Sequence, residues 1–194
     1  MKKIRLVITG NPGVGKHTSA KIIAEMINAE IIDINQVAID NNATGKRTDL
    51  GLDVDVKRLV RLLEKLLKTK KRDLVIVGHL APYVLKPAGI SLVAVLRRSP
   101  YELEKTLKKR GYSVDKVREN VASEILGTSL YDSLKTFGKR KVAEFDTTGK
   151  SPEETADEIW TTLQKNTKSK PKLLGIDWLI LVSEKGDMRR FFKY

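Results

Sequence analysis

The first twenty residues contain Ile4-Arg5-Leu6-Val7-Ile8-Thr9-Gly10-Asn11-Pro12-Gly13-Val14-Gly15-Lys16-His17-Thr18-Ser19-Ala20, where an apolar, β-branched run ends abruptly at a glycine-rich turn. The apolar residues that follow, from Ala20 to Ile27, repeat with the period of a helix. The sequence therefore predicts a strand, a loop and a helix, the setting of a phosphate-binding loop. In such a loop glycines adopt positive φ, backbone N–H groups converge on an anion, and the N-terminus of the helix adds partial positive charge.

This loop fits the pattern G-x-x-x-x-G-K-[ST] at every position but the last. Lys16 supplies a mobile positive charge for terminal phosphates. The hydroxyl that ligates Mg²⁺ is replaced by His17 and follows one residue later as Thr18, which matters because Mg²⁺ prefers oxygen to imidazole. A glycine-rich turn that merely joins a strand to a helix is the alternative, but three glycines, a lysine and both flanking elements in register favour a nucleotide site.

The composition indicates a globular protein without cysteine chemistry. The chain has 194 residues, of which 41% are hydrophobic and 31% are charged, so its length suits one core with appendages. Zero cysteines exclude disulfides and thiolate metal sites, and His17 and His79 are the only imidazole ligands in the sequence. No run approaches the ~20 apolar residues of a membrane span, and no cleavable leader follows Met1, so we expect a cytoplasmic protein with no membrane partner.

The formal net charge of +13 predicts polyanionic partners, namely nucleotides and then RNA or an RNA-bound protein. A lysine-rich surface that serves solubility or thermal stability explains the same charge equally well. The segment 56–68 has the apolar period of an amphipathic helix, and its polar face is basic. That face either contacts RNA or is simply solvated. Its basic residues are Lys57, Arg58, Arg61, Lys65 and Lys68.

Five apolar runs alternate with helical segments along the chain. Two of them, 74–77 and 92–96, are continuously apolar, which is typical of central parallel strands covered on both faces. The alternation predicts an α/β fold with a doubly wound, five-stranded parallel sheet, whose ligands bind at the carboxyl ends of the strands. The five expected strands are 4–8, 30–34, 74–77, 92–96 and 142–146, and the second is expected to be buried.

Two further segments lie near the carboxyl edge of this sheet. From 37 to 55 turn formers gather, so we expect short helices and a mobile loop, either a flap that accepts a nucleotide or a plain surface loop. Helices over 101–109 and 115–125 flank a turn that carries Arg110, with Arg118 beyond it. Such arginines clamp phosphates when a lid closes, or else pair on the surface with a nearby glutamate. The candidate glutamates are Glu102, Glu119 and Glu124.

Several segments together carry a family resemblance over about residues 3–163. They are Gly10-Asn11-Pro12-Gly13-Val14-Gly15-Lys16, Gly78-His79, Val95-Leu96-Arg97, Lys109-Arg110-Gly111-Tyr112-Ser113 and Lys116-Val117-Arg118-Glu119-Asn120-Val121-Ala122-Ser123-Glu124-Ile125. These segments resemble the atypical adenylate kinases of archaea and the eukaryotic nucleus, most specifically over 109–125. The segment 146–154 resembles the final strand and helix start of that family, with Ser151 as N-cap.

The resemblance implies a P-loop NTPase of nucleoside monophosphate kinase type, with a short lid and a monophosphate-binding segment over 33–55. It implies ATP and Mg²⁺ as cofactors, AMP as acceptor, and ATPase activity in assembly of the small ribosomal subunit, where a platform ribosomal protein and small-subunit RNA are the expected partners. Lys16 and Arg110 would be catalytic, and Thr18 would be the metal ligand. The residues that would hold ATP phosphates are Gly13, Val14, Gly15, Lys16, His17, Thr18 and the lid residue Arg110.

The sequence departs from the family where an acidic residue is usual, because Val77 occupies the position two before His79. Together with His17, this removes two oxygen ligands from the expected metal site. Mg²⁺ would then be held through Thr18, the substrate phosphates and water. Should another acid supply a ligand, Asp33 and Asp146 are the candidates, since both are expected at the carboxyl edge of the sheet.

The chain divides into a kinase-like domain over 1–165 and a basic, aromatic extension over 166–194. Residues 166–172 have the composition of a linker, and 176–182 is too short and apolar to assign to strand or helix. The last residues mix arginine with aromatic side chains, as nucleic-acid surfaces do. Packing of Trp178, Phe191 and Phe192 onto the domain is the favoured alternative, because exposed aromatics reduce solubility.

The expected function is that of a broad-specificity nucleoside monophosphate kinase that transfers the ATP γ-phosphoryl group to AMP. The alternative is an assembly factor that binds ATP as a conformational switch, hydrolyses it slowly and has little kinase activity. The missing carboxylate at Val77 and the charge of +13 favour the alternative, whereas the flap and lid segments favour the kinase.

Overall fold

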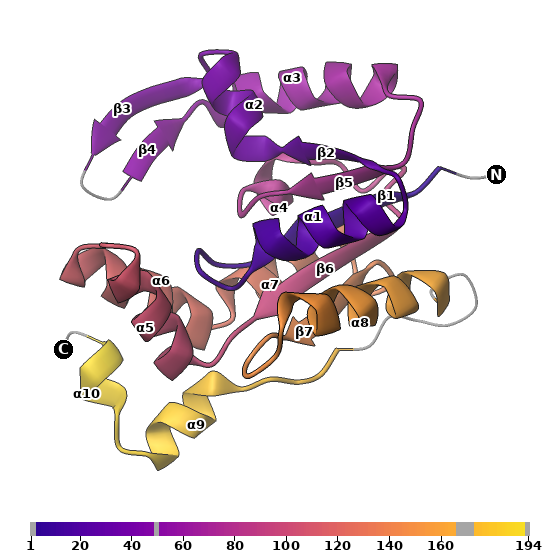
Figure 1. The fold of residues 1–194 in the computed structure, drawn as a ribbon. Helices are drawn as coiled ribbons and strands as arrows, with labels where there is room; N and C mark the ends of the chain where they lie inside the picture. Colours follow the sequence, from indigo (N-terminus) through magenta and orange to yellow (C-terminus); the bar gives the residue numbers. More distant parts are fainter. Residues whose placement is uncertain (1–2, 49–50, 166–172, 193–194) are drawn as a thin grey trace.

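A five-stranded parallel sheet forms the centre of the protein, whose computed structural model describes residues 3–48, 51–165 and 173–192 (Figure 1). The strand order is β2-β5-β1-β6-β7, and every neighbouring pair is parallel. The order changes direction at β1, which lies at the centre of the sheet, so the doubly wound prediction is confirmed. The strands are β1 (Arg5–Thr9), β2 (Glu30–Asp33), β5 (Leu74–Val77), β6 (Leu92–Arg97) and β7 (Val142–Asp146).

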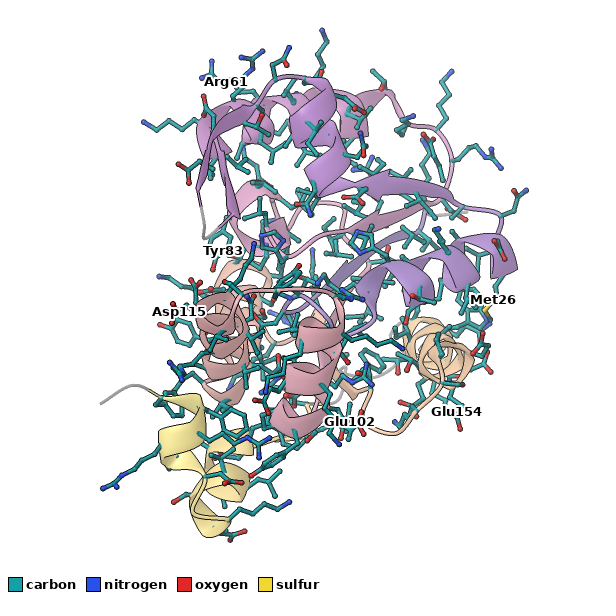
Figure 2. All side chains as sticks on the ribbon, turned by 60° about the vertical axis from the view of Figure 1, so that its left-hand side comes forward. Met26, Arg61, Tyr83, Glu102, Asp115 and Glu154 are labelled. Carbon is teal, nitrogen blue, oxygen red and sulfur yellow. The ribbon has the colours of Figure 1, made fainter. Side chains whose placement is uncertain are left out.

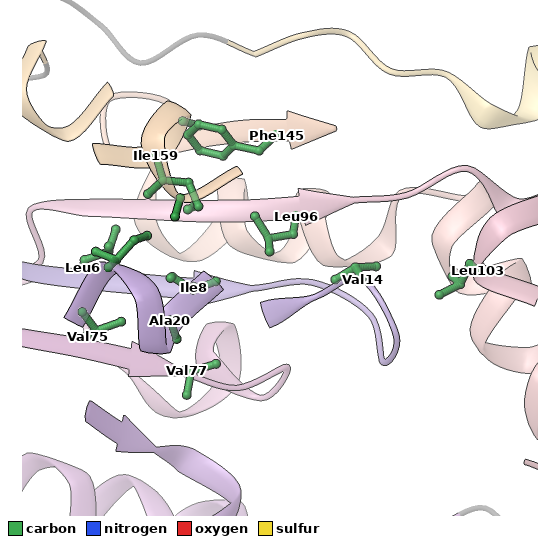
Figure 3. Close-up of a cluster of buried hydrophobic side chains, with 14 of the residues drawn as sticks. Leu6, Ile8, Val14, Ala20, Val75, Val77, Leu96, Leu103, Phe145 and Ile159 are labelled. Atoms are coloured by element: carbon green, nitrogen blue, oxygen red, sulfur yellow. The ribbon is translucent and has the colours of Figure 1, made fainter. Parts of the chain in front are cut away.

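Helices cover both faces of this sheet, because side chains alternate between the faces along each strand. Leu6 and Ile8 of β1 pack toward one face, whereas Val7 packs toward the other, and all three are fully buried. Figure 3 shows Leu6, Ile8, Ala20 and Ile159 meeting between the sheet and the helices of the first face. That face is covered by α1 (Lys16–Met26) and α8 (Pro152–Lys165), and the other by α3 (Val56–Thr69), α4 (Ala81–Val84) and α7 (Thr128–Phe137).

The second strand differs from its prediction at one end and in its burial. It is an edge strand, and Ile31 is exposed, so the expectation of a buried strand was wrong for part of its length. It ends at Asp33, and Ile34 is already the first residue of α2 (Ile34–Asp40). The reason is local, because the Asp33 carboxylate accepts hydrogen bonds from the amides of Asn35 and Gln36 and so caps the new helix.

The segment that follows α2 is a hairpin, β3 (Thr44–Thr48) and β4 (Gly51–Val54), and not the mobile loop that the turn formers suggested. The two strands pair antiparallel, with a register irregularity between Thr44 and Arg47. The expectation failed because these strands carry few apolar residues, so the period-2 signal of a half-buried strand is missing. The predicted short helix at the start of this region is present as α2.

The two helices expected between the fourth and fifth strands are confirmed as α5 (Pro100–Lys109) and α6 (Val114–Ile125). A third helix, α7, was missed, although Leu130, Leu134 and Phe137 have helical spacing. In Figure 1 the pair α5–α6 and the hairpin β3–β4 both project beyond the carboxyl edge of the sheet, one on each side of the loop that joins β1 to α1.

The C-terminal segment 173–192 contains α9 (Trp178–Glu184) and α10 (Met188–Phe191), which contact α6 (Figure 1). Phe191 is buried, and Trp178 and Phe192 pack against the same core, so the predicted return of these aromatics is confirmed. The linker expected over 166–172 lies outside the described residues. None of the helices within the described ranges combines the length and apolarity needed to cross a bilayer.

The predicted cap of α8 is also confirmed. The amide of Glu154 donates to Ser151 Oγ at 3.1 Å, and the amide of Ser151 donates to a carboxylate oxygen of Glu154 at 2.7 Å. This reciprocal pair is a capping box, so two amides at the start of α8 are satisfied by side chains rather than by water.

Candidate nucleotide site

The loop 10–15 follows the central strand β1 and has the backbone that its glycines were expected to provide. Gly15 is the N-cap of α1 with φ of 97°, and a Cβ there would meet nothing within 4 Å. Gly10 has φ of 134°, and a Cβ there would lie 2.4 Å from the carbonyl oxygen of Leu96. Gly10 therefore lets the loop approach β6, while Gly15 leaves open space at the N-terminus of α1.

Lys16 lies at the head of α1 and is 6% exposed. Its Nζ donates to the carbonyl oxygen of Asn11, at 2.8 Å, across the loop. Burial, and then the nearby charge of Arg110, lower the pKa of Lys16 to about 8. Within the described residues no carboxylate lies within 4 Å of this ammonium group, so Lys16 makes no direct ion pair there.

Arg110 caps the C-terminus of α5 and is exposed at the turn that leads to α6. Its charge helps to lower the Lys16 pKa, so the two cationic groups are close enough to interact electrostatically. Two of the glutamates considered as its surface partners are engaged elsewhere, Glu102 with Arg98 and Glu124 with Arg97. The site therefore joins two positive groups, as binding of a polyanion requires.

The second lid arginine has a different environment. The nearest described carboxylate oxygen to Arg118 is Asp115 Oδ1, 3.9 Å from Nη1, on the first turn of α6. Arg118 therefore has a partner on the surface, but this partner is not one of the three predicted glutamates, whereas Arg110 has an electrostatic link to Lys16.

The residue at the position of the missing hydroxyl contacts a carboxylate. His17 Nε2 lies 2.9 Å from Asp33 Oδ2, so the imidazole joins the start of α1 to the end of β2. Burial of the Asp33 carboxylate opposes its ionisation, but the hydrogen bond and charge of His17 and the two capping amides hold its pKa below the ordinary value. Nearby, desolvation and then the charge of Lys16 lower the pKa of His79 to about 4, so its imidazole is neutral at physiological pH.

These residues fit a protein-built magnesium site only in part. Val77 is the register partner of Asp33 and is buried and apolar, and the oxygens of Asp33 are already engaged by His17 and by α2. Thr18, the predicted metal ligand, lies on the first turn of α1 and is exposed. No group of three potential metal-ligating His, Asp or Glu side chains occurs among the described residues.

The two acids named as substitutes are far from equivalent. Asp33 ends β2 and Asp146 ends β7, so both lie at the carboxyl edge but on opposite outer strands of the sheet. Asp33 reaches the head of α1 through His17, whereas Asp146 accepts a hydrogen bond from the amide of Thr148. Asp33 is therefore the acid that belongs to this site.

Sequence reasoning missed a buried polar cluster beneath the loop. The Arg97 guanidinium, 1% exposed, lies between the carboxylates of Glu124 and Glu144, at 2.6 and 2.7 Å. Glu124 also accepts from the Asn11 side chain at 2.7 Å, which ties the loop to α6. The available signal was an arginine at the end of an otherwise apolar strand, because a charge in that place needs partners in the core.

Comparisons with known proteins agree with this geometry. A family model described as an AAA domain matches residues 6–127. A protein of Thermococcus onnurineus named "Putative adenylate kinase" is 37% identical over 172 residues, which cover 88% of this chain and 89% of that protein. A protein of the same name from Methanocaldococcus jannaschii is 32% identical, with 90% and 93% covered.

Solved structures share the fold at low sequence identity. Shikimate kinase from Acinetobacter baumannii, in complex with shikimate, is 14% identical with a TM-score of 0.63, over 86% of this chain and 96% of that one. A gluconokinase from Sinorhizobium meliloti is 15% identical with a TM-score of 0.57, over 84% and 93%. With its P-loop, its parallel sheet and its archaeal relatives, the chain belongs to the adenylate-kinase-like family of P-loop kinases.

Proposed function

We propose that the protein transfers the γ-phosphoryl group of ATP to AMP or a related nucleoside monophosphate, and that it hydrolyses ATP slowly when no acceptor is bound. The observation that carries this proposal is a glycine-rich loop that leads into α1 with Lys16 at its head, together with the charge of Arg110 close enough to lower the Lys16 pKa. Two cations without a carboxylate within 4 Å in the described chain are suited to a ligand of high negative charge.

Each part of the site has a role in this reaction. The backbone amides of residues 13–18 bind the ATP phosphates, and Lys16 neutralises the charge that develops between the β- and γ-phosphates. The acceptor binds under α2 and the hairpin β3–β4. Arg110 reaches the transferred group when α5 and α6 close, and closure excludes water that would otherwise take the phosphoryl group.

Magnesium enters this proposal with the nucleotide. Mg²⁺ supplies charge neutralisation on the phosphates and keeps several of its own waters. Thr18 is the proposed protein oxygen closest to it, since His17 and Val77 replace the two other oxygen donors expected.

A second candidate is an ATP-dependent switch in assembly of the small ribosomal subunit, and the specific observation that favours it is the surface of α3. At 100° per residue, the five basic side chains fall within an arc of about 100°, on a face about 16 Å long. All five are exposed, and Figure 2 shows Arg61 pointing away from the sheet. Glu64, on the same helix, pairs with Lys86 instead. The five residues of this α3 surface are Lys57, Arg58, Arg61, Lys65 and Lys68.

Such a face suits the phosphates of small-subunit RNA, and a platform ribosomal protein would be the adjoining partner. If the α3 surface is only solvated and binds no ligand, RNA should show no preference for it over other basic surfaces of the protein.

The first prediction tests the kinase. ADP formation from ATP should be several times faster with AMP than without it, and Lys16→Ala should lower the rate with AMP about 100-fold or more, because one preorganised cation is lost. Lys21→Ala, an exposed lysine on the same helix, should retain the wild-type rate. An equal rate of ADP formation with and without AMP in the wild type would contradict the kinase and favour the switch.

The lid generates the second prediction. Arg110→Ala should lower kcat for phosphoryl transfer about tenfold or more and change the KM for ATP much less, because closure forms this contact mainly in the transition state. Lys105→Ala, also exposed on α5, serves as the control. An unchanged kcat in Arg110→Ala would make Arg110 an ordinary surface residue.

A third prediction concerns the missing oxygen ligands. His17→Thr combined with Val77→Asp should raise kcat and lower the Mg²⁺ concentration for half-maximal activity, measured by titration at fixed ATP. Both single variants are needed beside the double variant, because neighbouring sites are seldom additive and the carboxylate introduced by Val77→Asp would lie next to Asp33. The idea fails if His17→Thr and Val77→Asp both leave the Mg²⁺ requirement unchanged and only Asp33→Asn changes it.

The fourth prediction tests the switch. Replacing Lys57, Arg61 and Lys65 with Gln should weaken binding to small-subunit RNA and reduce the slope of log affinity against log salt by about two to three, whereas the same replacement at Lys135, Lys139 and Arg140 should not. The control removes equal charge from exposed positions outside α3. Equal losses in both variants would mean that total charge, and not the α3 surface, accounts for RNA binding.

A further inference from the structure

Four donors from three separate parts of the chain meet on the carboxylate of Glu124. This residue lies on α6 and is 0% exposed. Its Oε2 accepts from Asn11 Nδ2 at 2.7 Å, and its Oε1 accepts from Arg97 Nε at 2.6 Å, from the Arg98 amide at 3.2 Å and from Trp178 Nε1 at 3.2 Å. One buried carboxylate therefore joins the phosphate-binding loop, the end of β6, the lid helix α6 and the C-terminal segment.

The contact with Asn11 leads directly to Lys16. The carbonyl oxygen of Asn11 accepts from Lys16 Nζ at 2.8 Å, and the Asn11 side-chain oxygen accepts from the hydroxyl groups of Ser123 at 3.0 Å and Ser129 at 3.4 Å. The orientation of Asn11 is thus fixed from the side of α6 and α7, and the position of the Lys16 ammonium depends on it. Only two residues, Glu124 and Asn11, therefore lie between Trp178 and Lys16 along this path of hydrogen bonds.

The segment that carries Trp178 is itself held at both ends. The amides of Leu174 and Gly175 each donate to Glu144 Oε2 at 3.0 Å, which anchors the start of the segment on β7. At the other end, Tyr101 donates to Asp187 at 2.7 Å, and Arg190 lies 2.6 Å from Glu104. Both of these partners belong to α5, so the segment spans from the sheet to the lid (Figure 1).

We propose that the C-terminal segment positions the nucleotide-binding loop through Trp178, Glu124 and Asn11, and thereby sets the affinity for the triphosphate. Trp178 and Glu124 are positioning residues, because they act on the nucleotide through Asn11 and Lys16. This inference rests on the proposed nucleotide site. The competing explanation is that Trp178 merely covers apolar core, and it predicts that loss of the indole N–H group leaves nucleotide binding unchanged.

The chain supplies a matched control, since it has two tryptophans. Trp178 and Trp160 are both half-buried and pack against the same core, and within the described ranges the indole of Trp178 donates a hydrogen bond whereas that of Trp160 does not. Replacement by Phe keeps an aromatic ring at each position and removes the N–H group. The difference between the two variants therefore isolates the hydrogen bond to Glu124.

The test measures ATP binding by calorimetry and thermal unfolding for the full chain and for Trp178→Phe and Trp160→Phe. Trp178→Phe should weaken ATP binding about threefold to tenfold, and Trp160→Phe should not, with the Tm of each variant showing that it is folded at the temperature of the binding measurement. Equal ATP affinity in the two variants would overturn the inference. Failure of the wild type to bind ATP would instead overturn the proposed nucleotide site.

A second measurement follows the same path by fluorescence and does not depend on the stability of Trp178→Phe. In Trp160→Phe the remaining tryptophan is Trp178, and its emission should change on addition of ATP. Adding Asn11→Ala removes the hydrogen bond between Asn11 and Glu124 at a position outside the C-terminal segment. The double variant should show no such response at ATP concentrations that saturate it. An emission that ignores ATP in Trp160→Phe, or a response that survives Asn11→Ala, would contradict the proposal.

Discussion

The guanidinium of Arg97 lies in the core between two carboxylates, and the arrangement of the site depends on it. A buried charge is tolerated only when its hydrogen-bonding groups are satisfied, and removing one partner of such a pair typically costs about 3 to 5 kcal/mol. Here Glu124, from α6, and Glu144, from β7, meet at the end of β6 because Arg97 is there. The cluster therefore fixes α6 against the sheet. Apolar packing alone would hold this helix with less directional specificity.

The remaining oxygens of the two carboxylates extend this constraint in opposite directions. Glu124 holds Asn11 and thus the loop above β1, while Glu144 accepts amides from the C-terminal segment. Loop, lid and terminal segment consequently share one set of buried hydrogen bonds. Glu124 also favours the charged form of Lys16 against the effects of burial and of Arg110.

The sequence was informative where a signal is local and repeated. Continuous apolar runs predicted β5 and β6, the glycines and Lys16 predicted the loop, and helical spacing predicted α3. The hairpin β3–β4 was missed because its strands have little apolar alternation, and the cluster of Arg97, Glu124 and Glu144 because it joins residues 27 and 47 positions apart. Pairing of charges over such separations is a property of the fold, and no window of sequence contains it.

Ground-state binding and catalysis make different demands on this site. In the proposed function the loop amides bind the ATP phosphates in the ground state and the transition state alike, and uniform binding of this kind leaves kcat unchanged. Loss of the acid at Val77 is instead expected to lower kcat, because it removes an oxygen ligand for Mg²⁺. In the proposed function, rate acceleration depends on a contact that forms only on closure, and we expect Arg110, which is exposed at the turn between α5 and α6, to make it. The balance between the proposed switch and the proposed kinase would then be set by how readily α5 and α6 close, and so by the contacts that hold these two helices.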